Sequence, residues 1–121
     1  MNIPFSPPDI TEEEIEAVAE VMRSGWITTG PKTKELERKM AEFTHTNRGV
    51  CLNSATSCME MALRLFEIGP GDEVIVPAYT YTASASVVCH VGATLRLVDV
   101  EKGTFHIDYA AVESMINENT K

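Results

Sequence analysis

The sequence has few of the features that would assign a function directly. It carries 10 basic against 18 acidic residues, a formal net charge of −8, whereas a surface that binds nucleic acid needs the opposite sign. Its cysteines, Cys51, Cys58 and Cys89, show no CxxC spacing. This pattern argues against a zinc site and is typical of reduced thiols in a cytoplasmic protein. We therefore expect a cytoplasmic protein with neither a metal ion nor a nucleic-acid partner.

Long hydrophobic runs and glycine-rich phosphate motifs are missing as well. The N-terminal segment MNIPFSPPDITEEE lacks the basic and apolar regions of a signal peptide. The most apolar stretch, residues 74–98, is interrupted by Pro77, His90 and Arg96, so it does not predict a membrane span. Neither GxGxxG nor GK[ST] occurs. A phosphate site in this chain would therefore need another pattern.

Helical and strand patterns alternate along the chain, which is typical of an α/β protein. Helices are predicted between Thr11 and Gly25, around Leu36 to Phe43, after residues 54–57, from Thr82 to Val91, and from Asp108 to about Asn117. Strands are predicted at Gly49–Leu52, residues 73–77 and residues 94–100. This order favours a mostly parallel sheet flanked by helices. Three strands make a thin sheet, so we expect an incomplete domain.

Two of the expected helices make specific predictions about side chains. Thr11 and Glu14 have the spacing of a capping box, and Ile10 with Ile15 could form a hydrophobic staple around it. In the third helix the apolar positions predict an inward face. That face consists of Met59, Ala62, Leu63 and Phe66.

Small hydroxylated residues stand where the first predicted strand meets the third helix, in CLNSATSCMEMALRLF. Backbone N–H groups at a helix start are unpaired, and the helix dipole favours an anion there. Ser54, Ala55, Thr56 and Ser57 would leave room for a phosphate. Plain N-capping by Asn53, Ser54 or Thr56 explains the same pattern equally well.

A second marked strand end is VPAYTYTAS, which presents Tyr79, Thr80, Tyr81 and Thr82 before the next helix. An aromatic ring there could lie flat on a planar ligand. The alternative, favoured for this segment alone, is that both tyrosines pack under the loop. Because ligands of parallel sheets collect at the carboxyl ends of strands, the two ends together indicate a planar phosphorylated ligand such as pyridoxal phosphate.

Several longer blocks give the chain a family resemblance. SGWITTGPKTKELE, NSATS-x-MEMAL, GPGDEVIVPAYTYTASAS, VGAT-x-x-x-VDV and the final TK closely resemble the DegT-type sugar aminotransferases. These are homodimeric, fold-type I, pyridoxal-phosphate enzymes that aminate keto groups on nucleotide-linked sugars, typically with glutamate as donor. The resemblance covers almost the whole chain but only the first third of such an enzyme. It implies that residues 1–121 are the N-terminal part of the cofactor-binding large domain.

The resemblance also implies roles for particular residues. The phosphate loop of the family falls on Ser54, Ala55 and Thr56, its cofactor-stacking aromatic on Tyr81, and its substrate-facing loop on residues 26–30, with Thr28, Thr29 and Gly30 as substrate contacts. Trp26 in that loop is either a substrate contact or an anchor of the loop or dimer.

The catalytic lysine of the family is not matched. Transamination needs a lysine that forms a Schiff base with the cofactor, and the family places it downstream of Lys121. Asp99 resembles a scaffold residue and not the carboxylate on the pyridine nitrogen. No catalytic residue is therefore assigned, and these residues alone are expected to be inactive. Two alternatives remain: a sugar dehydratase of the same fold, or a non-catalytic phosphate-binding or interaction module.

Overall fold

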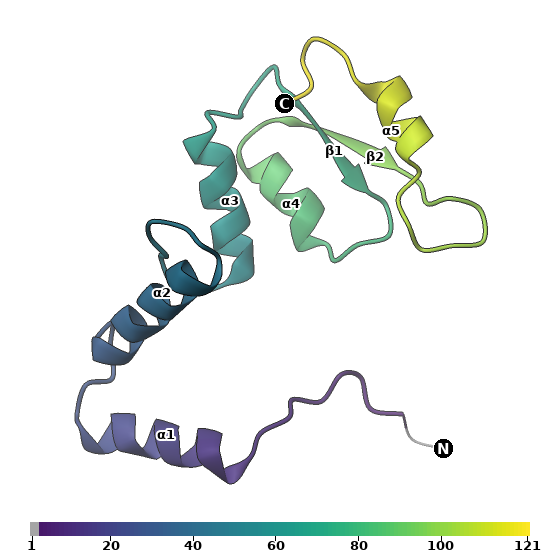
Figure 1. Ribbon diagram of the computed structural model, residues 1–121. Coiled ribbons are helices and arrows are strands. Elements are labelled where there is room, and N and C mark those ends of the chain that lie inside the picture. Colours follow the sequence, from purple (N-terminus) through teal and green to yellow (C-terminus); the bar gives the residue numbers. More distant parts are fainter. Residues whose placement is uncertain (1–2) are drawn as a thin grey trace. The chain divides into compact units, whose positions relative to one another are not determined.

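The computed structural model describes residues 3–121, which form two compact units: unit 1 ends at Cys51, and unit 2 spans Leu52–Lys121. Unit 1 contains α1 (Glu12–Arg23) and α2 (Pro31–Phe43) (Figure 1). Unit 2 contains α3 (Ala55–Leu65), β1 (Glu73–Pro77), α4 (Ala83–His90), β2 (Thr94–Val98) and α5 (Tyr109–Met115). The five predicted helices and two of the three predicted strands are present.

The start of α1 confirms the capping box. The backbone N–H of Thr11 donates to Glu14 Oε2 at 2.6 Å, and the Thr11 hydroxyl accepts from the first turn of the helix. The expected staple partners Ile10 and Ile15 are both more than half exposed. Ile15, Val18 and Met22, which share one face of α1, are all more than half exposed, so among the described residues no other element covers this face.

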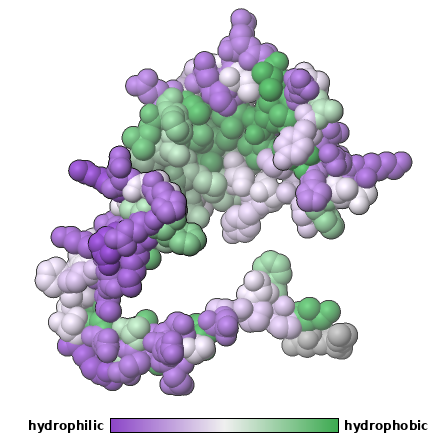
Figure 2. All heavy atoms as spheres, in the orientation of Figure 1, coloured by the Kyte–Doolittle hydropathy of each residue, from purple (hydrophilic) through white to green (hydrophobic). Residues whose placement is uncertain are grey.

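The core of unit 2 is a β1–α4–β2 crossover. The two strands pair in parallel, from Glu73 opposite Thr94 to Pro77 opposite Val98. Helix α4 covers them, and the core cluster consists of Val76, Val88, Val91 and Ala93, with Leu63 of α3 packed against it. Val88 is only 1% exposed. Figure 2 shows apolar residues gathered over this unit. The expected α/β arrangement with a parallel sheet is confirmed.

The prediction of a buried strand at Gly49–Leu52 is wrong. The segment has no strand structure, and Val50 is 75% exposed. A strand needs a neighbour for its backbone groups, and the part of the chain that the structure describes offers this segment none. Instead the Cys51 N–H donates to Glu37 Oε1 at 2.9 Å.

Additional pairing at the sheet comes from the last residues of the chain. Thr120 forms a parallel bridge with Glu73, flanked by Glu73 N–H to Asn119 O at 2.8 Å and Lys121 N–H to Glu73 O at 3.1 Å. Because the N–H and C=O of Glu73 both point to this segment, it lies on the edge of β1 opposite β2.

The inward face predicted for α3 is correct at three positions and wrong at the fourth. Met59, Ala62 and Leu63 are partly buried, whereas Phe66 is 77% exposed. Phe66 is the C-cap residue of α3, one position beyond the last helical residue, Leu65. Among residues 3–121, no helix combines the length and the apolar character that crossing a bilayer requires.

An ion-pair cluster joins α3 to α4. Glu60 accepts from Arg64 Nη2 at 2.7 Å on its own helix and lies 3.0 Å from Nδ1 of His90 on α4. Arg64, followed by His90, holds the pKa of the Glu60 carboxyl below its ordinary value of 4.5. A carboxylate with a lowered pKa stabilises the fold above pH 4.5, and the benefit is lost as the pH falls toward the lowered value.

We expect Glu60→Gln to have a lower free energy of unfolding than wild type at neutral pH. Between about pH 5 and pH 3 the free energy of unfolding should fall less steeply in the variant than in wild type, because glutamine does not take up a proton in this range. Urea unfolding followed across this range would measure it. Glu113→Gln is the matched control, because the Glu113 side chain makes no ion pair among the described residues. Parallel pH profiles for wild type and Glu60→Gln would contradict the prediction.

Candidate functional site

Helix α3 begins with a side-chain cap supplied by Ser54. The Ser54 backbone is extended, with φ −161° and ψ 157°, and its hydroxyl oxygen accepts from the Ser57 N–H at 3.1 Å. A second bond joins the Ser54 and Ser57 hydroxyls at 3.0 Å. Of the three candidates for an N-cap, Ser54 is therefore the residue that caps.

The cap leaves two backbone N–H groups of the first turn free. Cys58 N–H donates to Ser54 O at 3.1 Å, but within residues 3–121 the N–H groups of Ala55 and Thr56 have no acceptor. Ser54 and Ala55 are exposed, and Thr56 is partly exposed. The Ser54 side chain caps only the Ser57 N–H, so the N–H groups of Ala55 and Thr56 could still bind an anion. N-capping and phosphate binding are therefore compatible at this helix start.

The loop after β1 separates the roles of its two tyrosines. The Tyr79 ring stacks on Phe105, with ring centroids 4.9 Å apart and planes at 28°. Thr80 Oγ1 and Ser84 Oγ lie 3.0 Å apart and join the loop to the first turn of α4. Tyr81 is 81% exposed and has no aromatic partner among the described residues. Tyr81 is thus the ring that remains available to a ligand.

Sequence reasoning missed the segment that holds Tyr79. Residues 99–108 form a hairpin closed by a Val100–Ile107 bridge and by a bond of 2.9 Å from the Glu101 N–H to His106 O. Gly103, with φ 84°, makes its turn. The residues EKGT (101–104), which follow a predicted strand, indicate this turn. No sequence pattern indicates that Phe105 stacks on Tyr79.

The proposed cofactor contacts share unit 2. The first turns of α3 and α4 lie at the same lower end of this unit in Figure 1, and the loop that follows β1 leads into the first turn of α4. Asp99 follows β2, and its Oδ1 accepts from the Val100 N–H at 2.8 Å, a local contact that fits a scaffold position. No group of three or more potential metal ligands occurs in the range that the structure covers.

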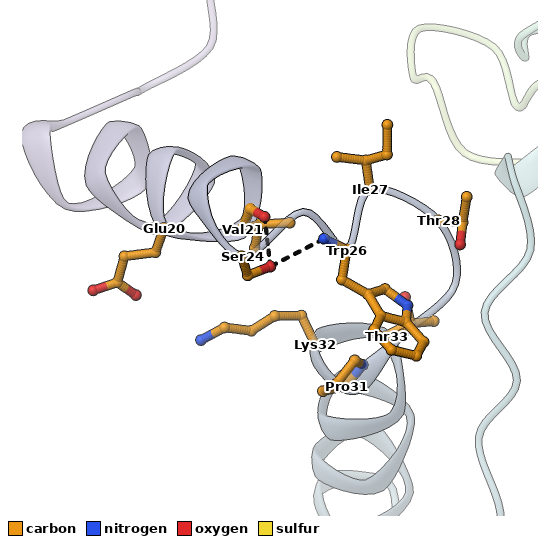
Figure 3. Close-up of a pocket in the computed structure, with 10 residues that line it drawn as sticks. Glu20, Val21, Ser24, Trp26, Ile27, Thr28, Pro31, Lys32 and Thr33 are labelled. Carbon is orange, nitrogen blue, oxygen red and sulfur yellow. Dashed lines mark hydrogen bonds between the residues drawn. The ribbon is translucent and has the colours of Figure 1, made fainter.

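The predicted substrate loop lies in unit 1 and borders a cavity of about 450 Å³. Figure 3 shows the residues around it, which come from the end of α1, the loop and the start of α2. They are Glu20, Val21, Ser24, Trp26, Ile27, Thr28, Gly30, Pro31, Lys32 and Thr33. Of the three predicted contacts, Thr28 and Gly30 line the cavity. Thr29 does not, and its carbonyl accepts from Trp26 Nε1 at 3.0 Å.

Comparison with known proteins gives a consistent result. The model of the DegT/DnrJ/EryC1/StrS aminotransferase family matches residues 8–121. The UDP-4-amino-4-deoxy-L-arabinose–oxoglutarate aminotransferase of Shewanella sediminis is 44% identical over 119 residues, which are 98% of this chain and 31% of that protein. This chain therefore spans about a third of the length of that relative.

Solved structures agree over the same range. Spr1654 of Streptococcus pneumoniae, solved in apo, PMP and PLP forms, is 63% identical with a TM-score of 0.90. The apo form is matched over 100% of this chain and 30% of its own length. An aminotransferase from Psychrobacter cryohalolentis is 34% identical with a TM-score of 0.85, over 98% of this chain and 31% of its own.

Proposed function

We propose that this chain, which belongs to the DegT/DnrJ/EryC1/StrS aminotransferase family, is the N-terminal part of a pyridoxal-phosphate-dependent enzyme that aminates a keto group on a nucleotide-linked sugar. The observation that carries the proposal is the pair of free N–H groups at the start of α3, in the same unit as the unstacked Tyr81 ring. A phosphate and a flat heteroaromatic ring are the two parts of the ligand that such a pair would hold.

The residues present fit this cofactor. The N–H groups of Ala55 and Thr56, with the Thr56 hydroxyl and the positive end of the eleven-residue helix α3, would bind the phosphate. Ser54 would shape that turn through its bonds to Ser57. The Tyr81 ring would lie against the pyridine ring. When bound, pyridoxal phosphate supplies an electron sink for transamination.

The substrate side of the proposal rests on the loop of unit 1. Thr28 and Gly30 line its cavity, and we propose that they and Thr29 contact the sugar. The name of the Shewanella sediminis relative includes a UDP-linked amino sugar and oxoglutarate. It supports a nucleotide-sugar substrate and glutamate as donor. We further propose a cytoplasmic homodimer, in keeping with the DegT resemblance.

None of the lysines in residues 1–121 is assigned as the Schiff-base residue, so we expect these residues alone to be inactive. The dehydratase alternative differs from an aminotransferase at that lysine. The residue at the position of that lysine in the full-length sequence therefore separates the two possibilities, and the full-length protein is the one to assay.

The test mixes full-length protein, loaded with pyridoxal phosphate, with glutamate and follows the cofactor absorbance and the release of 2-oxoglutarate. We expect conversion to the amine form of the cofactor and one equivalent of 2-oxoglutarate per site. In the reverse assay, UDP-4-amino-4-deoxy-L-arabinose with 2-oxoglutarate should yield glutamate. Cofactor binding without any reaction with glutamate would contradict the aminotransferase assignment.

A further inference from the structure

Trp26 is the only tryptophan of the chain. It makes hydrogen bonds to Ser24, just before its loop, and to Thr29, near the end of the loop. Its backbone N–H donates to Ser24 Oγ at 3.2 Å, and the Ser24 hydroxyl donates to Val21 O at 2.7 Å, so the start of the loop is tied to the last turn of α1. Its indole Nε1–H donates to Thr29 O at 3.0 Å. One side chain thus closes the turn from residue 26 to residue 29.

The indole also rests on the start of α2. Gly30, the N-cap residue of that helix, is buried, and a Cβ added there would lie well inside van der Waals contact with indole atoms Cδ1 and Nε1 of Trp26. The Gly30 backbone is extended, with φ −152° and ψ −157°, so its conformation alone does not require glycine. The indole ring occupies the space that a side chain at this position would take, so any other residue requires the ring to move.

We infer that Trp26 is a positioning residue for the substrate loop, residues 26–30. Its indole ring packs against Gly30 and thereby holds the loop in place. Thr28 lies inside the turn that the indole closes, and it lines the cavity that Figure 3 shows. Trp26 is 56% exposed, so burial in a core does not explain its placement. Its only N–H is already bonded to Thr29 O, which leaves the substrate no donor on this ring. The part of this inference that concerns substrate rests on the proposed function.

The contact can be tested by ¹⁹F NMR on full-length protein labelled with 5-fluorotryptophan. Trp26→Phe identifies the Trp26 resonance by its loss. Gly30→Ser is then expected to move or broaden that resonance, because its Cβ displaces the ring. Serine is a better N-cap than glycine, so a poorer helix start cannot explain the change. Thr29→Ala is the control: it keeps the carbonyl that accepts from Nε1, and the resonance should stay in place.

A double-mutant cycle gives an independent measure. We expect Gly30→Ser to raise the unfolding equilibrium constant about tenfold more in wild type than in a Trp26→Ala background, where the space for its side chain is open. Equal effects in both backgrounds, or a Trp26 resonance that Gly30→Ser leaves unmoved, would overturn the inference.

A functional readout distinguishes positioning from general stability. Trp26→Phe should raise KM for UDP-4-amino-4-deoxy-L-arabinose about threefold to tenfold, the range of one neutral hydrogen bond, while affinity for pyridoxal phosphate is unchanged. Unchanged KM in an active Trp26→Phe enzyme would contradict the positioning role. Absence of any reaction of the wild-type holoenzyme with glutamate would contradict the proposed function instead, and the NMR result and the cycle would still decide the role of Trp26.

Discussion

Replacing Thr56 with valine in the full-length protein is expected to weaken binding of pyridoxal phosphate about ten- to hundredfold. A hydrogen bond to a charged group contributes about 1.5–3 kcal/mol, and valine keeps the branched shape while removing the hydroxyl. Thr56 is the second residue of α3, beside the free N–H groups that the proposal assigns to the phosphate. Fluorescence or absorbance titration of the apo-protein with the cofactor measures the change.

A matched control for this variant is Thr94→Val. Thr94 is an exposed residue at the start of β2, and its hydroxyl makes no hydrogen bond among the described residues. Strand positions also favour valine, so the fold should tolerate the change. Cofactor affinity that is unchanged in Thr56→Val, with Thr94→Val also unchanged, would show that the Thr56 hydroxyl does not bind the phosphate.

Tyr81→Ala is expected to weaken cofactor binding about threefold to tenfold and to shift the absorption maximum of the bound cofactor. Stacking of aromatic rings contributes about 0.5–1.5 kcal/mol beyond the area that it buries. The Tyr81 ring is free to make this contact because, among the described aromatic residues, only Tyr79 and Phe105 stack on each other. The same titration, read as a spectrum, reports both effects.

Tyr79→Leu is the comparison that separates the two tyrosines. It should change loop order through loss of the Phe105 contact while leaving the spectrum of the bound cofactor close to wild type. If Tyr79→Leu shifts the spectrum and Tyr81→Ala does not, the ring that faces the cofactor is Tyr79, and the assignment from the family resemblance is wrong.

Local signals in the sequence were sufficient where a feature depends on neighbouring residues. The capping box of Thr11 and Glu14 acts within one helical turn, and it is present. The parallel pairing of β1 and β2 follows from two apolar runs joined by a helix, because that connection favours a parallel crossover. The family resemblance is confirmed by the relatives.

Features that depend on a partner elsewhere were not predictable. The apolar residues of Gly49–Leu52 are typical of a strand, but a strand forms only when a neighbouring strand pairs with it, and none of the described residues does so here. Stacking of Tyr79 on Phe105 joins two loops that periodicity does not relate. Trp26 left two interpretations open from the sequence. The bond to Thr29 O and the fit over Gly30 favour the loop anchor.

The most direct test of the central claim is a crystal structure of the full-length protein grown with pyridoxal phosphate. We predict the phosphate within hydrogen-bonding distance of the backbone N–H groups of Ala55 and Thr56, with the Tyr81 ring against the pyridine. A cofactor phosphate bound away from the first turn of α3, with those N–H groups facing solvent, would contradict the account.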